Sequence, residues 1–198
     1  MGLSIHYSGS LRSPDLLPEL IEEVKDIVEV FKWEYGICEE KFPADTFGKK
    51  SYNQNIYGIY FTIPECETIS ICFLSNGRMA SPASLKFYGN SDNKDEQNFL
   101  YMISVKTQFA GIKMHKFIIH LFKHLNKKYF QNFKMFDEGD YWETEDEKLL
   151  ESNFKKYTAL LDSFSFALEN QPIKPGESVE AYLKRLLNQI NDRKSKRK

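Results

Sequence analysis

The sequence predicts an α+β fold, in which one antiparallel sheet of about five to six strands carries helices mainly on one face. The middle of the 198-residue chain contains segments that alternate between apolar and other residues, joined by short links. Such segments are typical of antiparallel strands. The segments before and after them repeat apolar residues at helical spacing instead. The resulting order, β-α-β-β-β-β-α-β-α-α, favours a sheet with segregated helices over a parallel βαβ arrangement.

The first two elements are a short strand and a long helix. Residues 3–9, LSIHYSG, are predicted to be extended, although His6 and Tyr7 interrupt the apolar pattern. Ser13 is a good capping residue, and Pro14 at the first helical position sacrifices no hydrogen bond. The helix that follows is predicted from seven apolar residues at helical spacing, and its opposite face is acidic. These apolar residues are Leu17, Leu20, Ile21, Val24, Ile27, Val28 and Phe31.

The middle of the chain is predicted to be a meander of strands. Residues 55–63 and 68–74 alternate with period two, and Asn76-Gly77 follows them as a strong hairpin signal. Residues 84–89 are predicted to be the return strand, and residues 90–97 a polar loop. Another strand is predicted within residues 99–109.

The C-terminal half is predicted to be mainly helical. Helices are expected at residues 111–130 and 147–169, with an extended segment at 133–143 between them. We predict three parts: an α+β domain over residues 1–170, a C-terminal helix within 171–191, and a disordered basic tail at 192–198. Because prolines interrupt the connection before the last helix, that helix is expected to pack on its own domain or on a neighbouring copy.

Composition limits the classes of function. The chain has 27 basic and 28 acidic residues and a net charge of −1, which does not favour binding to nucleic acid or to an anionic membrane. No apolar run is long enough to span a membrane, and the N-terminal residues lack the features of a signal peptide. The three cysteines have no C-x-x-C spacing, so free thiols in a reducing compartment are expected. We therefore predict a cytoplasmic protein.

An unusually acidic segment lies near the C-terminal third. Seven of the eleven residues from 137 to 147 are acidic, with Tyr141 and Trp142 among them. Thr144 and Glu147 have the spacing of a capping box, which would place the acids from Glu145 to Glu147 in the first turn of a helix. Two interpretations remain for Asp140, Glu143 and the two aromatic residues. They form a recognition surface, or one aromatic anchors the segment while the acids are solvated.

Three histidines lie on the predicted helix at 111–130. His120 and His124 are four residues apart, as two metal ligands on one helix would be, but HLFKH lacks the glutamate of the H-E-x-x-H motif. The sequence therefore predicts no metal site and no cofactor. An alternative function is a hydrolase-type enzyme, in which His6, His120 or His124 performs acid–base chemistry with the acids of residues 137–143 in a cleft.

The same helix carries a basic stripe, made of Lys113, Lys116, His120, Lys123 and Lys127. The preferred interpretation is a stripe that is solvated or paired with the acidic segment of its own chain. A protein partner is the second interpretation and nucleic acid the third, since no nucleic-acid motif accompanies the stripe.

Two short segments, IHYSG at residues 5–9 and DEGDYWET at residues 137–144, resemble a group of uncharacterised bacterial proteins. The resemblance implies a bacterial cytosolic protein and no particular activity. It leads to the hypothesis that the first and last strands bring one surface patch together. The patch would contain His6, Tyr7, Asp140, Tyr141, Trp142 and Glu143.

Because no catalytic motif is present and the charged faces are complementary, we predict a non-enzymatic protein-interaction module of regulatory, inhibitor or immunity type. The predicted contact residues are those of the patch together with Lys116, Lys123 and Lys127. Both a protein partner and a homodimer are compatible with the sequence.

Overall fold

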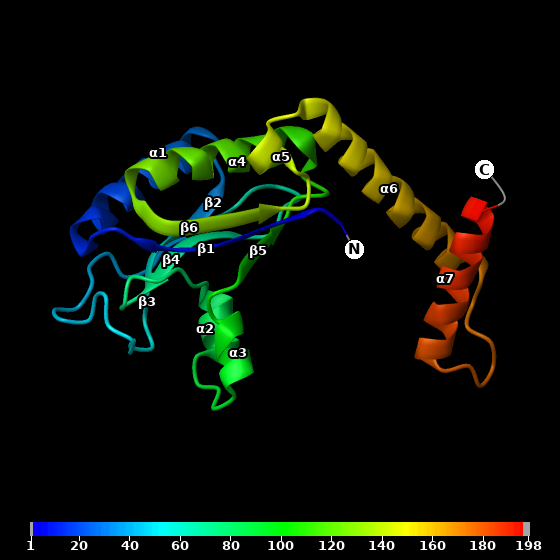
Figure 1. Cartoon of the computed structure of the whole chain (residues 1–198), viewed down its shortest axis with the longest axis horizontal. Helices are drawn as coiled ribbons and strands as arrows, with labels where there is room; N and C mark the ends of the chain where they lie inside the picture. The colour runs from blue at the N-terminus through cyan, green and yellow to red at the C-terminus, as the bar shows by residue number, and fades with distance from the viewer. Residues whose placement is uncertain (1, 196–198) are drawn as a thin grey trace.

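The computed structural model describes the backbone of residues 2–195 and the side chains of residues 2–93 and 95–188 (Figure 1). It is an α+β structure, with a body that contains all of the strands and a helical extension at the C-terminal end. The elements are β1 (Ser4–Leu11), the 3₁₀ turn η1 (Pro14–Leu16), α1 (Leu17–Val30), β2 (Glu34–Ile37), β3 (Ile56–Thr62), β4 (Ile69–Leu74), α2 (Pro82–Tyr88), α3 (Lys94–Phe99), β5 (Ile103–Lys106), α4 (Gly111–Lys128), β6 (Phe130–Asp137), α5 (Tyr141–Thr144), α6 (Glu147–Asn170) and α7 (Val179–Ser195).

The strands form two separate three-stranded antiparallel sheets, in the orders β5-β1-β6 and β2-β3-β4, so the prediction of a single sheet is wrong. The turn at Asn76-Gly77 explains the difference. The residues after this turn make only isolated bridges, from Arg78 to Ser10 of β1 and from Met79 to Phe73 of β4. Strands β5 and β6 flank β1, and among the described residues no strand of the second sheet pairs with β1.

The return strand predicted at residues 84–89 is also wrong, because the chain forms α2 there. Ser81 caps this helix: its hydroxyl accepts a hydrogen bond from the Ser84 N–H at 2.9 Å, and Pro82 occupies the first turn. The segment predicted as a polar loop contains α3, which is capped by Asn93. Strand β2 is an element that the sequence analysis did not predict.

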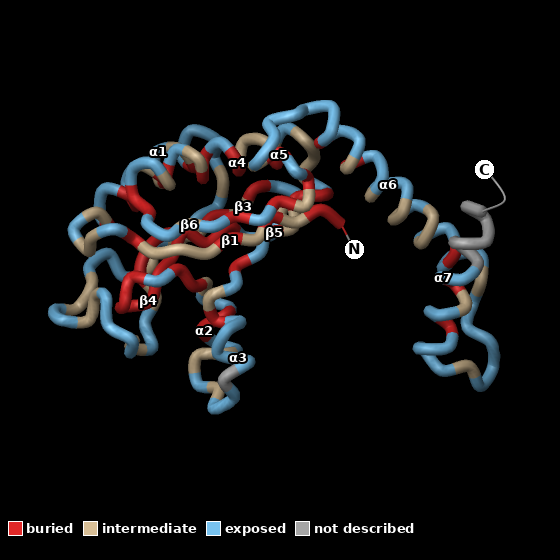
Figure 2. Tube along the Cα trace, viewed as in Figure 1, coloured by how far each residue is buried: buried red, intermediate tan, exposed pale blue. Residues whose placement is uncertain are grey.

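Helices α1 and α4 cover the sheets and bury most of the core (Figure 2). Helix α1 packs on β3, and α4 packs on β6. Tyr7 of β1 and Phe122 of α4 meet in the interior, with their ring centroids 4.5 Å apart. Five of the seven apolar residues predicted for the first helix are buried in α1, whereas Ile27 is partly buried and Phe31 is 48% exposed.

The C-terminal helices leave the body. Leu150 and Phe154 at the start of α6 are buried with the main core, after which the helix extends away (Figures 1 and 2). Helix α7 packs on the far end of α6, where Tyr182 and Leu186 are buried with Ala167. We call residues 160–188 the arm. Helix α7 extends to Ser195, and the remaining residues of the predicted basic tail, 196–198, lie outside the described part.

Among the described residues, no helix combines the length and the apolar composition needed to cross a membrane.

Candidate functional site

A polar network lies in the interior of the body, where α4, the end of β6 and Thr107, the residue after β5, come together. The side chains of His115 on α4 and Asp137 on β6 are both fully buried, and His115 Nε2 lies 2.9 Å from Asp137 Oδ1. The other ring nitrogen, Nδ1, lies 2.7 Å from the hydroxyl oxygen of Thr107. A buried charge needs such partners, since an unpaired one is strongly destabilising.

Asp137 also organises the turn that follows it. Its carboxylate accepts hydrogen bonds from the backbone N–H groups of Gly139, Tyr141 and Trp142, at 2.7, 2.8 and 3.0 Å. Burial would raise the pKa of Asp137, but His115 and these N–H groups outweigh it and hold the pKa below its ordinary value. The network therefore fixes the β6–α5 turn, and the side chains of His115 and Asp137 at its centre are closed to solvent.

The β6–α5 turn also holds the start of α6, the helix that leads into the arm. A Cβ atom on Gly139 would lie 2.6 Å from Leu150 Cδ1 and 2.9 Å from His115 Nε2, so only glycine fits between α6 and the network. The side-chain amide of Asn153 donates a hydrogen bond to the Gly139 carbonyl at 3.2 Å. Phe154 meets the His115 ring edge-on, with centroids 5.5 Å apart. The network thus determines where α6 leaves the body.

The capping box predicted at Thr144 and Glu147 is wrong. Asp146 is the N-cap of α6, and its carboxylate accepts hydrogen bonds from the N–H groups of Lys148 and Leu149 at 2.8 and 3.1 Å. Glu145 has a φ of +53°, a left-handed conformation that separates α5 from α6. Of the three acids assigned to the first turn, Glu147 alone occupies it.

The basic stripe of α4 faces the acidic segment of its own chain. Lys116 forms an ion pair with Glu147, and Lys123 forms one with Glu145. The two ammonium groups also lie over aromatic rings, 5.6 Å from the centroid of Tyr141 and 5.5 Å from that of Trp142. These contacts agree with the intramolecular interpretation of the stripe. The side chain of Lys127 is exposed.

The predicted patch is divided between the interior and the surface, because some of its residues are buried and others are exposed. Tyr7 lies in the core, where its hydroxyl donates a hydrogen bond to the Ser70 carbonyl at 2.9 Å. Tyr141 is buried as well, whereas Trp142 is half-buried. His6 is on the outer face, with Nε2 3.9 Å from the Glu138 carboxylate. Asp140 accepts a hydrogen bond from Asn153 at 3.1 Å, and Glu143 is exposed.

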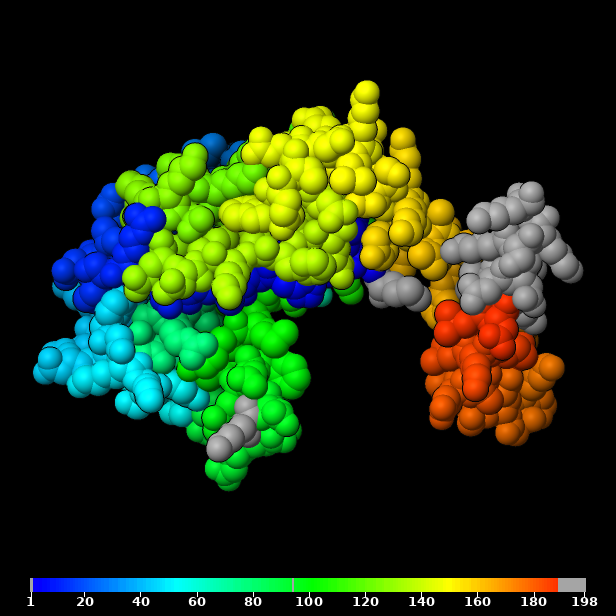
Figure 3. All heavy atoms as spheres, in the orientation of Figure 1, coloured from blue at the N-terminus to red at the C-terminus, as the bar shows by residue number. Residues whose placement is uncertain are grey.

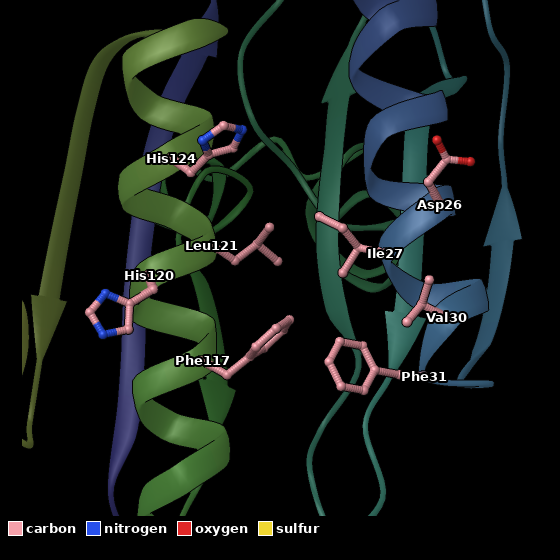
Figure 4. Close-up of a pocket in the computed structure, with 8 residues that line it drawn as sticks. All are labelled: Asp26, Ile27, Val30, Phe31, Phe117, His120, Leu121 and His124. Carbon is pink, nitrogen blue, oxygen red and sulfur yellow. The ribbon is translucent and has the colours of Figure 1, made fainter.

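A groove of about 420 Å³ runs between α1 and α4 (Figure 4). Apolar side chains point into it from both helices, Ile27 and Phe31 on one side and Phe117 and Leu121 on the other. Val30 and Phe31 remain 78% and 48% exposed, so the groove is an open surface feature. Asp26, His120 and His124 complete its lining.

The two histidines of this groove have different neighbours. His124 pairs with Glu23 on α1, whereas the His120 ring meets Tyr141 edge-on, with centroids 5.8 Å apart. The groove contains none of the acids of residues 137–143. Among the described residues, no group of three or more histidine, cysteine, aspartate or glutamate side chains is arranged to hold a metal ion.

The arm carries a second exposed apolar surface. Helix α7 buries Tyr182 and Leu186 against α6, while the next residue along the chain in each case, Leu183 and Leu187, is 38% and 46% exposed. Val179 on α7 and Leu168 on α6 are 64% and 39% exposed. The apolar stripe of α7 is therefore wider than the surface that α6 covers.

Comparison with known proteins found no matching family model, no matching curated protein and no matching solved structure. The resemblance to bacterial proteins stays a prediction.

Sequence reasoning missed the groove and the exposed side of the arm. A signal for each exists in the sequence. Val30 and Phe31 continue the apolar series of α1 beyond the turn where a core-facing stripe would stop, and Leu183-Leu187 adds a second apolar row beside Tyr182-Leu186. Both patterns indicate helices with more apolar surface than a single contact buries.

Proposed function

We propose that this protein is a non-enzymatic protein-interaction module and that the arm is its contact surface. The supporting observation is the exposed apolar row of α7 on a helix pair that extends away from the body. Figure 3 shows the arm separated from α2 and α3 by open space. Large apolar side chains gathered on a projecting element are typical of a surface that another protein covers.

The energetics support the same conclusion. Full burial of one leucine side chain stabilises a contact by about 1.5–3 kcal/mol. Among the described residues, the buried apolar side chains that α7 contributes to its contact with α6 are Tyr182 and Leu186. Helices gain most of their stability from tertiary packing, so a partner that covers Leu183 and Leu187 would stabilise α7 and gain affinity at once.

The alternatives have less support. The buried pair of His115 and Asp137 is closed to a substrate, and the groove that contains His120 and His124 is lined mainly by apolar side chains. Lys116 and Lys123 of the basic stripe are engaged with Glu147 and Glu145, which reduces the positive charge that they offer to nucleic acid.

Affinity capture from a nuclease-treated lysate of the native organism tests the proposal. The baits are the tagged wild-type chain, the double variant Leu183→Ser/Leu187→Ser and the control Phe87→Ser, whose side chain on α2 is 72% exposed. We expect wild type and control to retain one protein in stoichiometric amount. An untagged copy of this chain counts as such a protein. The double variant should retain at least about tenfold less of that protein. Equal retention by all three baits, or no retained protein, would contradict the proposal.

A further inference from the structure

We propose that Cys38 is a site of reversible oxidation by hydrogen peroxide, and that the neighbouring Cys72 activates it. The product is the sulfenic acid of Cys38. The inference concerns the second sheet and does not depend on the arm. Three observations carry it: the position of both cysteines opposite Gly58, the different burial of the two thiols, and their spacing across the sheet.

Gly58 of β3 brings the two cysteines onto one face of the sheet. On one side its register partner is Cys72 of β4. On the other side the N–H of Cys38, the residue after β2, donates a hydrogen bond to the Gly58 carbonyl at 2.8 Å. Residues that lie opposite one another in adjacent strands point their side chains to the same face. Because glycine has no side chain, the strand between the two thiols does not separate them.

The two thiols differ in access to solvent and in the proton that they hold. Cys38 is half-buried, whereas Cys72 is fully buried, with its sulfur 3.2 Å from the Ile59 carbonyl oxygen. A hydrogen bond from Cys72 lowers the pKa of Cys38 and outweighs both burial and the charge of Glu39. Burial raises the pKa of Cys72. The pair therefore loses its first proton at Cys38, the thiol that solvent reaches.

Cys66, the third cysteine, has the opposite environment. It is also half-buried, but its thiol donates a hydrogen bond to the Lys106 carbonyl at 3.3 Å. Burial, together with the charge of Glu67, raises the pKa of Cys66 to about 11. Cys66 therefore stays protonated at neutral pH and is an internal control for Cys38.

Hydrogen peroxide is the oxidant that this setting favours, because accessible thiols of low pKa beside a second cysteine are typical of peroxide-sensitive sites. The Cys38 thiolate attacks one peroxide oxygen. A sulfur–oxygen bond forms, the oxygen–oxygen bond breaks and hydroxide leaves, so that the sulfur loses two electrons and the peroxide gains them.

The spacing of the strands determines what happens to the product. Neighbouring strands lie about 4.8 Å apart, so the Cα atoms of Cys38 and Cys72, on either side of β3, are about 10 Å apart. A disulfide spans at most about 7 Å between Cα atoms. The sulfenic acid is therefore reduced by external thiols instead: two of them form a disulfide with each other, the oxygen leaves as water, and the Cys38 thiol is restored.

Trapping the product at each cysteine tests the inference. The reduced full chain is treated with hydrogen peroxide and then with dimedone, which reacts with sulfenic acids, and mass spectrometry of the peptides measures the adduct at each site. We expect Cys38 to react at least about tenfold faster than Cys66. Dithiothreitol added between the two steps should remove the adduct. Equal rates at Cys38 and Cys66, or no adduct at Cys38, would overturn the inference without any variant.

Two substitutions separate activation by Cys72 from its packing. Cys72→Ala removes the hydrogen-bond donor, whereas Cys72→Ser keeps one, and circular dichroism checks that both variants fold. In Cys72→Ala, we expect the pH midpoint of Cys38 alkylation by iodoacetamide to rise and the peroxide reaction at pH 7 to slow at least about threefold. Cys72→Ser should retain the wild-type midpoint. An unchanged midpoint in Cys72→Ala, or a Cys38–Cys72 disulfide as the main product in wild type, would contradict the inference.

Discussion

Asp137 carries a carboxylate into the interior, and its surroundings explain how the fold accommodates it. Three backbone N–H groups donate to the carboxylate, His115 Nε2 lies 2.9 Å from it, and Thr107 lies against the other ring nitrogen. Removing one partner of such a pair leaves the other buried without compensation, which costs more than the pair itself contributes.

We expect Asp137→Ala to lower the free energy of unfolding by about 3–5 kcal/mol. The β6–α5 turn should loosen, and with it the root of α6. Urea denaturation followed by circular dichroism measures the loss. Glu151→Ala, an exposed residue on α6, serves as control and should change the stability by less than about 0.5 kcal/mol. A loss of similar size in both variants would show that the network is not a structural centre.

Glu23 makes the stability of the fold depend on pH in the acidic range. Burial alone would raise its pKa, but hydrogen bonds from Lys128, Tyr129 and His124 outweigh it and lower the pKa from 4.5 to about 2. A carboxylate whose pKa is lower in the folded state contributes stability above its unfolded pKa and loses it as pH falls. The free energy of unfolding should therefore fall between pH 4.5 and about pH 2. Glu23→Gln should lose less over this range, and identical pH profiles of the two proteins would refute the assignment.

Individual residues were predictable where the signal is local. The helical spacing in α4 correctly placed Lys116 and Lys123 on one stripe, and pairing with the acidic segment was among the expected outcomes. The role of Asp137 was not predictable, because its partner His115, and Thr107 on the other side of that histidine, come from distant positions in the chain. Only tertiary structure brings them together.

At the scale of elements, the long amphipathic helices were predicted correctly and the short elements less well. Residues 84–89 alternate as a strand would, but Ser81 and Pro82 provide a helix start that outweighs the pattern. The N-cap of α6 is Asp146, two residues after the Thr144 that the capping-box spacing implied, because the left-handed Glu145 separates Thr144 from the helix. Capping geometry decides both cases.

The described contacts of α7 are made with α6 and the 171–178 segment and not with the body, so we expect α7 to detach independently of the body. Leu186→Ala removes a fully buried side chain from its contact with α6. In dilute solution, trypsin should then cleave after Lys184 and Arg185 at least about tenfold faster, while the melting temperature of the body stays unchanged. Leu187→Ala, which is half exposed, is the matched control. Equal cleavage rates in wild type and Leu186→Ala would show that α7 is held by other contacts.

At the scale of the whole molecule, the α+β class was predictable and the division into two sheets was not. Local alternation identifies strands but does not say which strands pair, and here β1 takes β5 and β6 as neighbours while the turn at Asn76-Gly77 only bridges to it. The projection of the arm away from the body was also not predictable from the sequence. Its helices were expected, but the sequence alone does not show which apolar rows stay uncovered.

Amide hydrogen exchange of the full chain, measured alone at low concentration and again with the captured partner, tests most directly whether the arm is the contact surface. We predict that residues 179–188 exchange rapidly in the isolated chain and slow down strongly when the partner binds, because α7 then gains the packing that it lacks. Exchange in the β3 and β4 strands should not change. If the partner instead protects only the α4 stripe, or if α7 exchanges equally slowly in both states, the arm is not the contact surface.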